Sequence, residues 1–220
     1  MTLKAVLFDL DGTLLDTAPD FYTTLNQLRA EHGMSSLDYE SIRRTVSNGA
    51  RALIDLSFEV ERDTPEFDRL LNRLLEIYSQ NLANDTRLFT GMDEVLQHLA
   101  EHNLAWGIVT NKSSLYTLPI LAALNLDPTP AAVICPDHVT HTKPHAEPLV
   151  LACQQLKCQT SEGLYVGDHL RDIDCGKNAG MPTVAVSYGY IAQQDDPSLW
   201  QADHLIDSAI ELKLIIDRYL

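Results

Sequence analysis

The sequence predicts an α/β fold in which a parallel sheet, wound on both faces with helices, carries a small helical insert after its first strand. Two observations predict this fold. Short, continuous apolar runs alternate with amphipathic stretches of helical periodicity, and one long segment near the N-terminus interrupts that alternation. The 220 residues suffice for one large domain or for a core with a smaller inserted domain.

The predicted strands are short apolar runs that end at or just before polar residues. Such runs are typical of strands buried on both faces, as in a parallel sheet covered by helices. The expected strands are Ala5–Phe8, Trp106–Val109, Ala131–Cys135, Leu164–Val166, Thr183–Val186 and Leu205–Ile206. Helical patterns lie between them at Met92–His102, Leu115–Leu124, Glu147–Leu156 and Asp172–Ala179. This order of elements predicts a doubly wound, Rossmann-like core.

The interrupting segment runs from about Asp16 to Asn84 and contains no strand-like run. Pro19 and Pro65 lie near helix starts, where proline is tolerated. The patterns predict helices at Phe21–His32, Tyr39–Val46, Ala50–Phe58 and Glu66–Leu82. We therefore expect a core domain of residues 1–15 and 85–220 and an α-helical cap domain of residues 16–84, with residues 87–91 returning the chain to the core.

The composition restricts the classes of partner. A net charge of −15 argues against nucleic acid and anionic membranes, which require patches of Lys and Arg. It does not exclude a small phosphorylated metabolite, because one metal ion and one lysine can invert the local charge of a pocket. The four cysteines form no CxxC pair, and we find neither a signal peptide nor an apolar run near the ~20 residues of a membrane span. We expect a cytoplasmic monomer or homodimer.

Asp9 and Asp11 directly follow the first predicted strand. In extended chain, side chains two residues apart point the same way, about 7 Å apart. Two carboxylates facing one site repel each other unless a cation or a shared proton offsets their charge. Gly12 allows the chain to turn sharply after the strand. A surface turn is the alternative, and the buried character of the preceding strand disfavours it.

Two later strand ends carry residues that suit a phosphate group. The hydroxyl of Thr110 and nearby N–H groups could hold phosphate oxygens at a helix start, although Thr110 could equally be a helix cap, as could Asn111 or Ser113. Lys143 precedes Pro144, which favours an extended conformation, and its ammonium could neutralise phosphate. The alternative for Lys143 is a solvated side chain. Parallel strand ends converge at one edge, so these groups should meet Asp9.

Asp168 and Asp172 follow the strand at Leu164–Val166 and lie four residues apart. Mg²⁺ prefers carboxylate oxygens and keeps several waters. Asp168 is therefore the candidate direct ligand, while Asp172 could bind through water or orient Lys143. The alternative is that Asp168 caps the next helix and Asp172 favours its first turn.

Other polar residues give weaker predictions. His138, His141 and His145 cluster near Lys143, but their loop-like spacing and the absence of paired cysteines disfavour a transition-metal site. His138 or His169 could still line the pocket. In the helical insert, Arg51 could act as a substrate-selecting cation or could be a surface arginine at a helix start, and both interpretations stay open.

Taken together, these residues resemble the haloacid dehalogenase (HAD) superfamily of phosphotransferases. The family pattern DxDGT matches Asp9–Thr13, its Ser/Thr motif matches Thr110, its lysine motif matches Lys143, and GDxxxD matches Gly167–Asp172. The four motifs occur in the family order, and the resemblance covers nearly the whole chain. The helical insert resembles the small α-helical cap of that family.

The resemblance implies a phosphatase with a definite assignment of roles. Asp9 would be the nucleophile that forms an aspartyl-phosphate, and Asp11 would be the general acid and base. Mg²⁺ would be held by Asp9, the backbone carbonyl of Asp11 and Asp168, with Asp172 acting through water. The phosphoryl oxygens would be bound by Thr110, Asn111 and Lys143.

Within the superfamily, the chain is similar to the phosphoglycolate phosphatase group and more so to bacterial N-acetylmuramic acid 6-phosphate phosphatases of peptidoglycan recycling. The stretches that carry this likeness are Ser47–Leu53, Val109–Lys112, Ile134–Val139, Val166–Ile173 and Tyr188–Ile191. A sugar phosphomutase would keep the same motifs and stays an alternative. A receiver-type signalling module with a phosphorylated Asp is a second alternative, disfavoured because the acidic pair follows the first strand and an insert of about 70 residues exceeds the usual connections.

Overall fold

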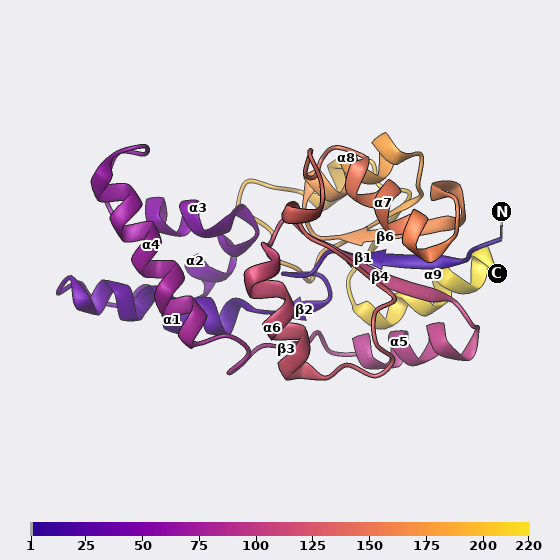
Figure 1. Cartoon of the computed structure of the whole chain (residues 1–220), viewed down its shortest axis with the longest axis horizontal. Coiled ribbons are helices and arrows are strands. Elements are labelled where there is room, and N and C mark those ends of the chain that lie inside the picture. Colours follow the sequence, from indigo (N-terminus) through magenta and orange to yellow (C-terminus); the bar gives the residue numbers. More distant parts are fainter. Residues whose placement is uncertain (1) are drawn as a thin grey trace.

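Six parallel strands form the central sheet of the computed structural model, which describes residues 2–220 (Figure 1). Their spatial order is β5-β4-β1-β6-β7-β8, which places β1, the strand that precedes Asp9, between β4 and β6. The strands are β1 (Ala5–Phe8), β4 (Ala105–Val109), β5 (Ala132–Ile134), β6 (Gly163–Gly167), β7 (Thr183–Val186) and β8 (His204–Ile206). The predicted doubly wound α/β core is confirmed, and all six predicted strands are present.

Helices cover both faces of the sheet because side chains alternate along each strand. Val6 and Phe8 pack with α5 and α9 on one face, whereas Leu7 packs with α7 and α8 on the other. The core helices are α5 (Met92–Glu101), α6 (Ser114–Leu124), α7 (Glu147–Leu156), α8 (Leu170–Ala179) and α9 (Leu212–Tyr219). Helix α9 was not predicted from the sequence.

Four helices gather at one end of the molecule, beyond the carboxyl end of the sheet (Figure 1). They have an apolar cluster of their own, which includes Leu25, Leu53, Leu74 and Ile77. The helices are α1 (Ala18–Glu31), α2 (Tyr39–Arg43), α3 (Gly49–Ser57) and α4 (Pro65–Gln80). The expected helix over Tyr39–Val46 ends at Arg43, and a 3₁₀ turn at Val46–Asn48 leads into α3. We call this helical part the cap.

The chain passes between core and cap through two short antiparallel strands, β2 (Leu15–Asp16) and β3 (Arg87–Leu88). Two-residue strands leave no periodic signal, so β2 and β3 were not predicted from the sequence. The hydroxyl of Tyr190 accepts from the N–H groups of Thr17 and Ala18, at 2.6 and 2.8 Å, and donates to Asp16 at 2.7 Å. Tyr190 thereby fixes the start of the cap. In residues 2–220, no helix is both long and apolar enough to span a membrane.

Candidate active site

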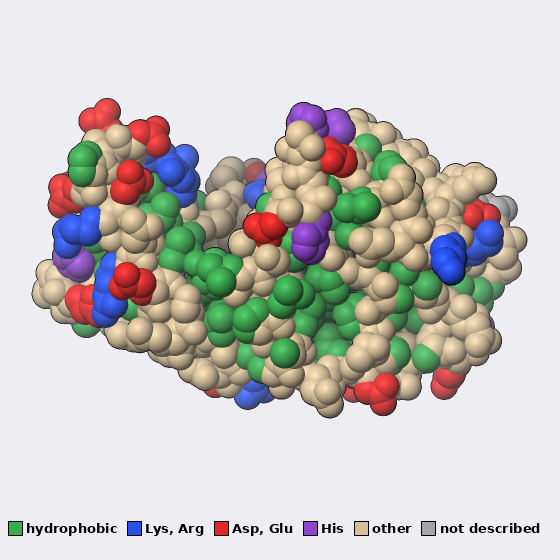
Figure 2. Space-filling model, in the orientation of Figure 1, with side chains coloured by type: hydrophobic (Ala, Val, Ile, Leu, Met, Phe, Trp, Pro, Cys, Tyr) green, Lys and Arg blue, Asp and Glu red, His purple; other side chains and the backbone are tan. Residues whose placement is uncertain are grey.

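A cavity of about 240 Å³ lies between the cap and the carboxyl ends of the strands. The space-filling view shows the molecule hollowed between these two parts (Figure 2). Five residues singled out from the sequence line the cavity together: Asp9, Asp11, Thr110, Asn111 and Lys143. They come from three segments far apart in the chain, as expected where parallel strands end at one edge of a sheet.

Lys143 forms the charged centre of this site. Its Nζ lies 2.8 Å from Asp9 Oδ1 and 2.7 Å from Asp172 Oδ1, and it donates to the carbonyl of Val109 at 3.0 Å. The residue is only 4% exposed, so its charge is compensated by these partners instead of by water. The structure therefore excludes a solvated Lys143, and it shows Asp172 orienting the lysine.

Asp168 is buried and accepts hydrogen bonds from three directions. Its partners are the Thr13 hydroxyl at 3.3 Å, the Ser47 hydroxyl at 2.9 Å and the Tyr190 N–H at 2.8 Å. Asp168 is not the N-terminal capping residue of α8. That residue is His169, whose Nδ1 accepts a hydrogen bond from the Arg171 N–H at 3.1 Å. Ser47 belongs to the cap, so the cap contacts Asp168 directly.

Asp9, Asp168 and Asp172 place carboxylate oxygens within 4.8 Å of one another. Burial, together with the neighbouring carboxylates, raises the pKa of Asp9 to about 6 and that of Asp168 to about 7. Lys143, which lowers the pKa of Asp9, supplies one positive charge to a cluster with three carboxyl groups. Hard oxygen donors with surplus negative charge fit a divalent cation such as Mg²⁺.

Gly12 is required for the loop after β1 to approach this cluster. Its φ is +86°, and a Cβ placed there would lie 2.1 Å from Asp168 Oδ2. Any other residue would have to displace the buried carboxylate as well as adopt a left-handed conformation. The glycine of the DxDGT motif is therefore required by the close packing of this loop against Asp168.

Asn111 joins two strand-end loops, and Thr110 forms a hydrogen bond within the first of them. The Thr110 hydroxyl accepts from the Lys112 N–H at 3.1 Å, whereas Ser113 caps α6. Thr110 is therefore not the helix cap. Asn111 Nδ2 donates to the Lys143 carbonyl at 3.1 Å, and its Oδ1 accepts from the Lys143 N–H at 3.2 Å. Asn111 thus holds the backbone of Lys143 beside Thr110.

Asp11 takes partners different from those of Asp9. It accepts from the Thr17 hydroxyl and pairs with Lys112 Nζ at 2.9 Å. Lys112 Nζ also donates to the Tyr78 hydroxyl at 2.6 Å and lies 4.8 Å from the centre of the Phe21 ring. Tyr78 and Phe21 belong to the cap, so Lys112 links Asp11 to it. This role of Lys112 was not predicted from the sequence, although Lys112 directly follows Thr110 and Asn111.

The other candidate residues lie as follows. Arg51 is absent from the cavity lining; it pairs with Asp63 at 3.3 Å on the surface and lies over the Phe67 ring. The structure therefore gives Arg51 no contact with the site.

Of the histidines, His169 lines the cavity, and burial lowers its pKa to about 4. His138 instead accepts a hydrogen bond from the Cys135 N–H. His141, His145 and Glu147 form a separate, largely exposed group.

Arg171 also lines the cavity and was not singled out from the sequence. It lies within the spacer of the GDxxxD motif, where the family pattern gives no signal. Three aromatic residues of the lining, Phe21, Tyr78 and Tyr116, were likewise missed, because aromatic positions at helical spacing are usually core residues.

Comparison with known proteins tests the predicted family resemblance. The pattern of the family described as haloacid dehalogenase-like hydrolase matches residues 6–186. An N-acetylmuramic acid 6-phosphate phosphatase from Pseudomonas putida is 45% identical over 220 residues, which cover 100% of this chain and 99% of that protein. A phosphoglycolate phosphatase from Xanthomonas campestris is 38% identical over 209 residues, covering 95% of this chain and 94% of that protein.

A solved structure described as a predicted phosphoglycolate phosphatase from Haemophilus somnus has the same fold, with a TM-score of 0.85, 24% identity and 98% coverage of both chains. The match over most of the chain and the full-length relatives confirm the predicted resemblance. The chain belongs to the haloacid dehalogenase-like hydrolases, and it is an enzyme of their phosphatase group.

Proposed function

We propose that this protein is a Mg²⁺-dependent phosphatase that hydrolyses a small phosphomonoester through an aspartyl-phosphate on Asp9. The observation that carries the proposal is the placement of Asp9 in the cavity, paired with Lys143 at 2.8 Å and grouped with two further carboxylates. This arrangement offers a nucleophile, a phosphate-neutralising cation and hard oxygen ligands at one point. Phosphoryl transfer requires mainly positioning and charge neutralisation.

The reaction would proceed in two steps. In the first, a carboxylate oxygen of Asp9 attacks phosphorus, the bond to the leaving oxygen breaks, and Asp11 donates a proton to that oxygen. In the second, Asp11 takes a proton from water as the water attacks phosphorus. Inorganic phosphate leaves, and the carboxylate of Asp9 is regenerated.

The residues around Asp9 would bind the phosphoryl group and the cation. The phosphoryl oxygens would be bound by Thr110, Asn111 and Lys143. Asp9, the backbone carbonyl of Asp11 and Asp168 would hold Mg²⁺. Asp172 would act through Lys143 or through water. When bound, the ion would neutralise charge on the phosphoryl oxygens.

We favour N-acetylmuramic acid 6-phosphate as the substrate, which implies a role in peptidoglycan recycling in the cytoplasm, with 2-phosphoglycolate as the second candidate. The higher identity to the Pseudomonas putida phosphatase supports this order. The cap side of the cavity supports it as well, since the rings of Phe21, Tyr78 and Tyr116 offer an apolar surface on which a sugar ring can pack.

The test is a phosphate-release screen with Mg²⁺ on N-acetylmuramic acid 6-phosphate, 2-phosphoglycolate and a panel of sugar monophosphates. We expect release from the first, the second or both. A sugar phosphomutase would interconvert isomers without releasing phosphate, and a receiver-type module would keep a stable phospho-Asp without turnover. Absence of phosphate release from every monophosphate would contradict the proposed function.

Asp11→Asn is expected to lower kcat on sugar phosphates by about 10²–10⁴-fold, because the variant cannot donate a proton to the leaving oxygen or accept one from water. With p-nitrophenyl phosphate, whose leaving group needs no proton, Asp9 should still be phosphorylated. Rapid mixing should then give a burst of about one p-nitrophenolate per enzyme, followed by slow turnover. A steady rate without a burst would show that Asp11 is not needed for the second step.

Mg²⁺ is expected to stabilise the fold more at pH 8 than at pH 5.5. The pKa of Asp9 and that of Asp168 are raised in the folded state, to about 6 and 7, so their contribution to stability is most favourable at low pH and is lost as pH rises through these values. Above pH 7 both carboxylates are charged, and a cation relieves their repulsion. At pH 5.5 protons compete for the same oxygens.

Thermal unfolding at constant ionic strength provides the measurement. With Mg²⁺ at 100 times its Kd, the expected rise in Tm at pH 8 is about 5–10 °C. Asp168→Asn should abolish the rise. A rise of equal size at both pH values, or one that persists in Asp168→Asn, would place the cation elsewhere.

A further inference from the structure

Three cationic side chains line the cavity within residues 2–220, and two of them are neutralised by aspartates. Lys143 is paired with Asp9 and Asp172, and Lys112 is paired with Asp11 at 2.9 Å. The third, Arg171, is half-buried, and no ion pair or hydrogen bond in the described chain engages its guanidinium. In a chain with 31 acidic and 16 basic residues, a cavity-facing arginine without a carboxylate partner calls for an explanation.

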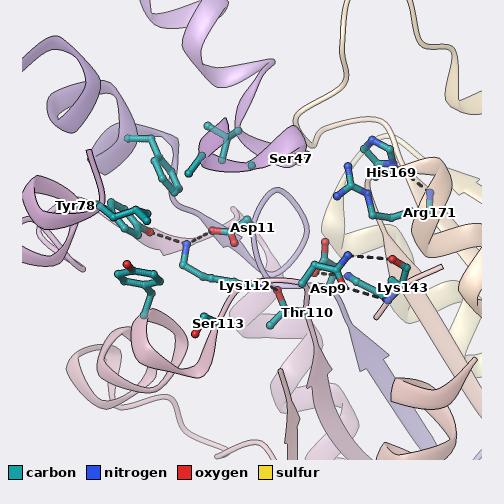
Figure 3. A pocket seen from close by; sticks show the side chains of 17 residues that line it. Asp9, Asp11, Ser47, Tyr78, Thr110, Lys112, Ser113, Lys143, His169 and Arg171 are labelled. Carbon is teal, nitrogen blue, oxygen red and sulfur yellow. Dashed lines mark hydrogen bonds and ion pairs between the residues drawn. The ribbon is translucent and has the colours of Figure 1, made fainter. Parts of the chain in front are cut away.

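Arg171 belongs to α8, whereas Thr110 and Lys143, which would handle the phosphate, come from two other segments. Figure 3 places Arg171 and His169 on one side of the cavity and Tyr78 on the other, with Asp9 between them. The phosphate at Asp9 would be held by Lys143 and Thr110. The guanidinium is thus available to a second group of the same ligand.

The chemistry of that second group follows from the guanidinium. Its five N–H donors form a planar fork that matches a carboxylate in a bidentate geometry. This inference rests on the proposed function. Both candidate substrates, N-acetylmuramic acid 6-phosphate and 2-phosphoglycolate, carry a carboxylate in the part of the molecule that leaves. We propose that Arg171 is the receptor for this carboxylate and makes the enzyme selective for acidic phosphomonoesters.

A carboxylate bound at Arg171 takes no part in the bond that breaks. The contact would form in the bound ground state and persist in the transition state, so its loss should raise KM with little change in kcat. A charge-assisted hydrogen bond contributes more than a neutral one, and removing this contact should lower kcat/KM by about 10- to 100-fold. The effect should appear only with ligands that carry the carboxylate.

Matched substrates test this proposal. N-acetylglucosamine 6-phosphate is the same amino sugar phosphate without the lactyl ether that bears the carboxylate, and ethyl phosphate is the corresponding partner of 2-phosphoglycolate. Kinetics are measured with Mg²⁺ on the full-length enzyme, Arg171→Gln, Arg171→Lys and Arg218→Gln. Arg218 is an exposed arginine of α9 that does not line the cavity, so it is a matched control.

We expect the wild-type enzyme to prefer the acidic member of each pair that it hydrolyses. Arg171→Gln should remove that preference through KM and leave the neutral member within about threefold. Arg171→Lys should restore part of the preference because it keeps the charge and loses the fork. Arg218→Gln should match the wild type. A Tm within about 2 °C of the wild type shows that the variants are folded.

Two results would overturn the proposal while leaving the phosphatase activity standing. One is a wild-type enzyme that releases phosphate equally well from both members of a pair. The other is Arg171→Gln losing activity equally on both members, which would place Arg171 at the phosphate. Failure of the proposed function itself would look different, because no monophosphate would release phosphate.

Discussion

Asp9→Asn is expected to lower kcat by at least about 10⁴-fold on every phosphomonoester that the wild-type enzyme hydrolyses. The amide cannot attack phosphorus as a carboxylate does, and it removes one oxygen ligand from the group formed with Asp168 and Asp172. The substitution is nearly isosteric. It also replaces a buried carboxylate, whose pKa is raised to about 6, with a neutral amide, so the free energy of unfolding should not fall.

Steady-state phosphate release and rapid mixing with p-nitrophenyl phosphate measure this effect. Asp9→Asn should give neither turnover nor a burst, in contrast to the burst expected for Asp11→Asn. Asp174→Asn, the same change on α8 outside the cavity lining, provides the matched control and should behave as the wild type. Activity of Asp9→Asn within tenfold of the wild type, with the substitution verified by mass spectrometry, would rule out Asp9 as the nucleophile.

Lys143→Met should lower both activity and stability. The variant loses the cation that would face the phosphoryl oxygens, for which we expect a fall in kcat/KM of about 10³-fold. It also leaves Asp172 buried without its charge partner. Breaking a buried ion pair from one side costs about 3–5 kcal/mol of the free energy of unfolding. Without Lys143, which lowers the pKa of Asp9, that pKa should rise further, so the stability deficit should shrink as pH falls from 8 to 5.

A second substitution separates the two effects of Lys143→Met. Lys143→Met with Asp172→Asn removes the unpaired charge and should recover much of the lost stability without recovering activity. Lys213→Met, on α9 and outside the cavity lining, controls for the loss of a lysine. Urea unfolding and phosphate release measure the outcome. If the double variant regained activity together with stability, Lys143 would have only a structural role.

The fold was predictable from the sequence because its strands are buried on both faces and its helices are amphipathic. The run Ala5–Phe8 became β1 with those bounds, and its side chains alternate between two apolar clusters. The elements that were missed have physical reasons. The strands β2 and β3 are two residues each, and they form only because the passage between core and cap brings Leu15 beside Leu88.

The predicted candidate residues Asp9, Thr110, Asn111 and Lys143 meet at one cavity because parallel strands end at one edge, a property that strand order alone implies. Which partner each acid takes did not follow from that rule. Asp9 and Asp11 are two residues apart in the chain, yet they take different partners. Asp9 pairs with Lys143, whereas Asp11 pairs with Lys112, which is 101 residues away from Asp11 in the chain.

The sequence by itself predicted the proposed chemistry from three signals: an acidic pair after a buried strand, a lysine before a proline and a second acidic pair after a later strand. These signals are local, because each depends on residue types and on the element that precedes them. Only the tertiary structure decided which arginine faces the cavity. Arg51 is held by Asp63 on the surface of the cap, while Arg171 lines the cavity. The direction and the partners of a long side chain depend on which distant segments pack around it, and residue spacing does not record that.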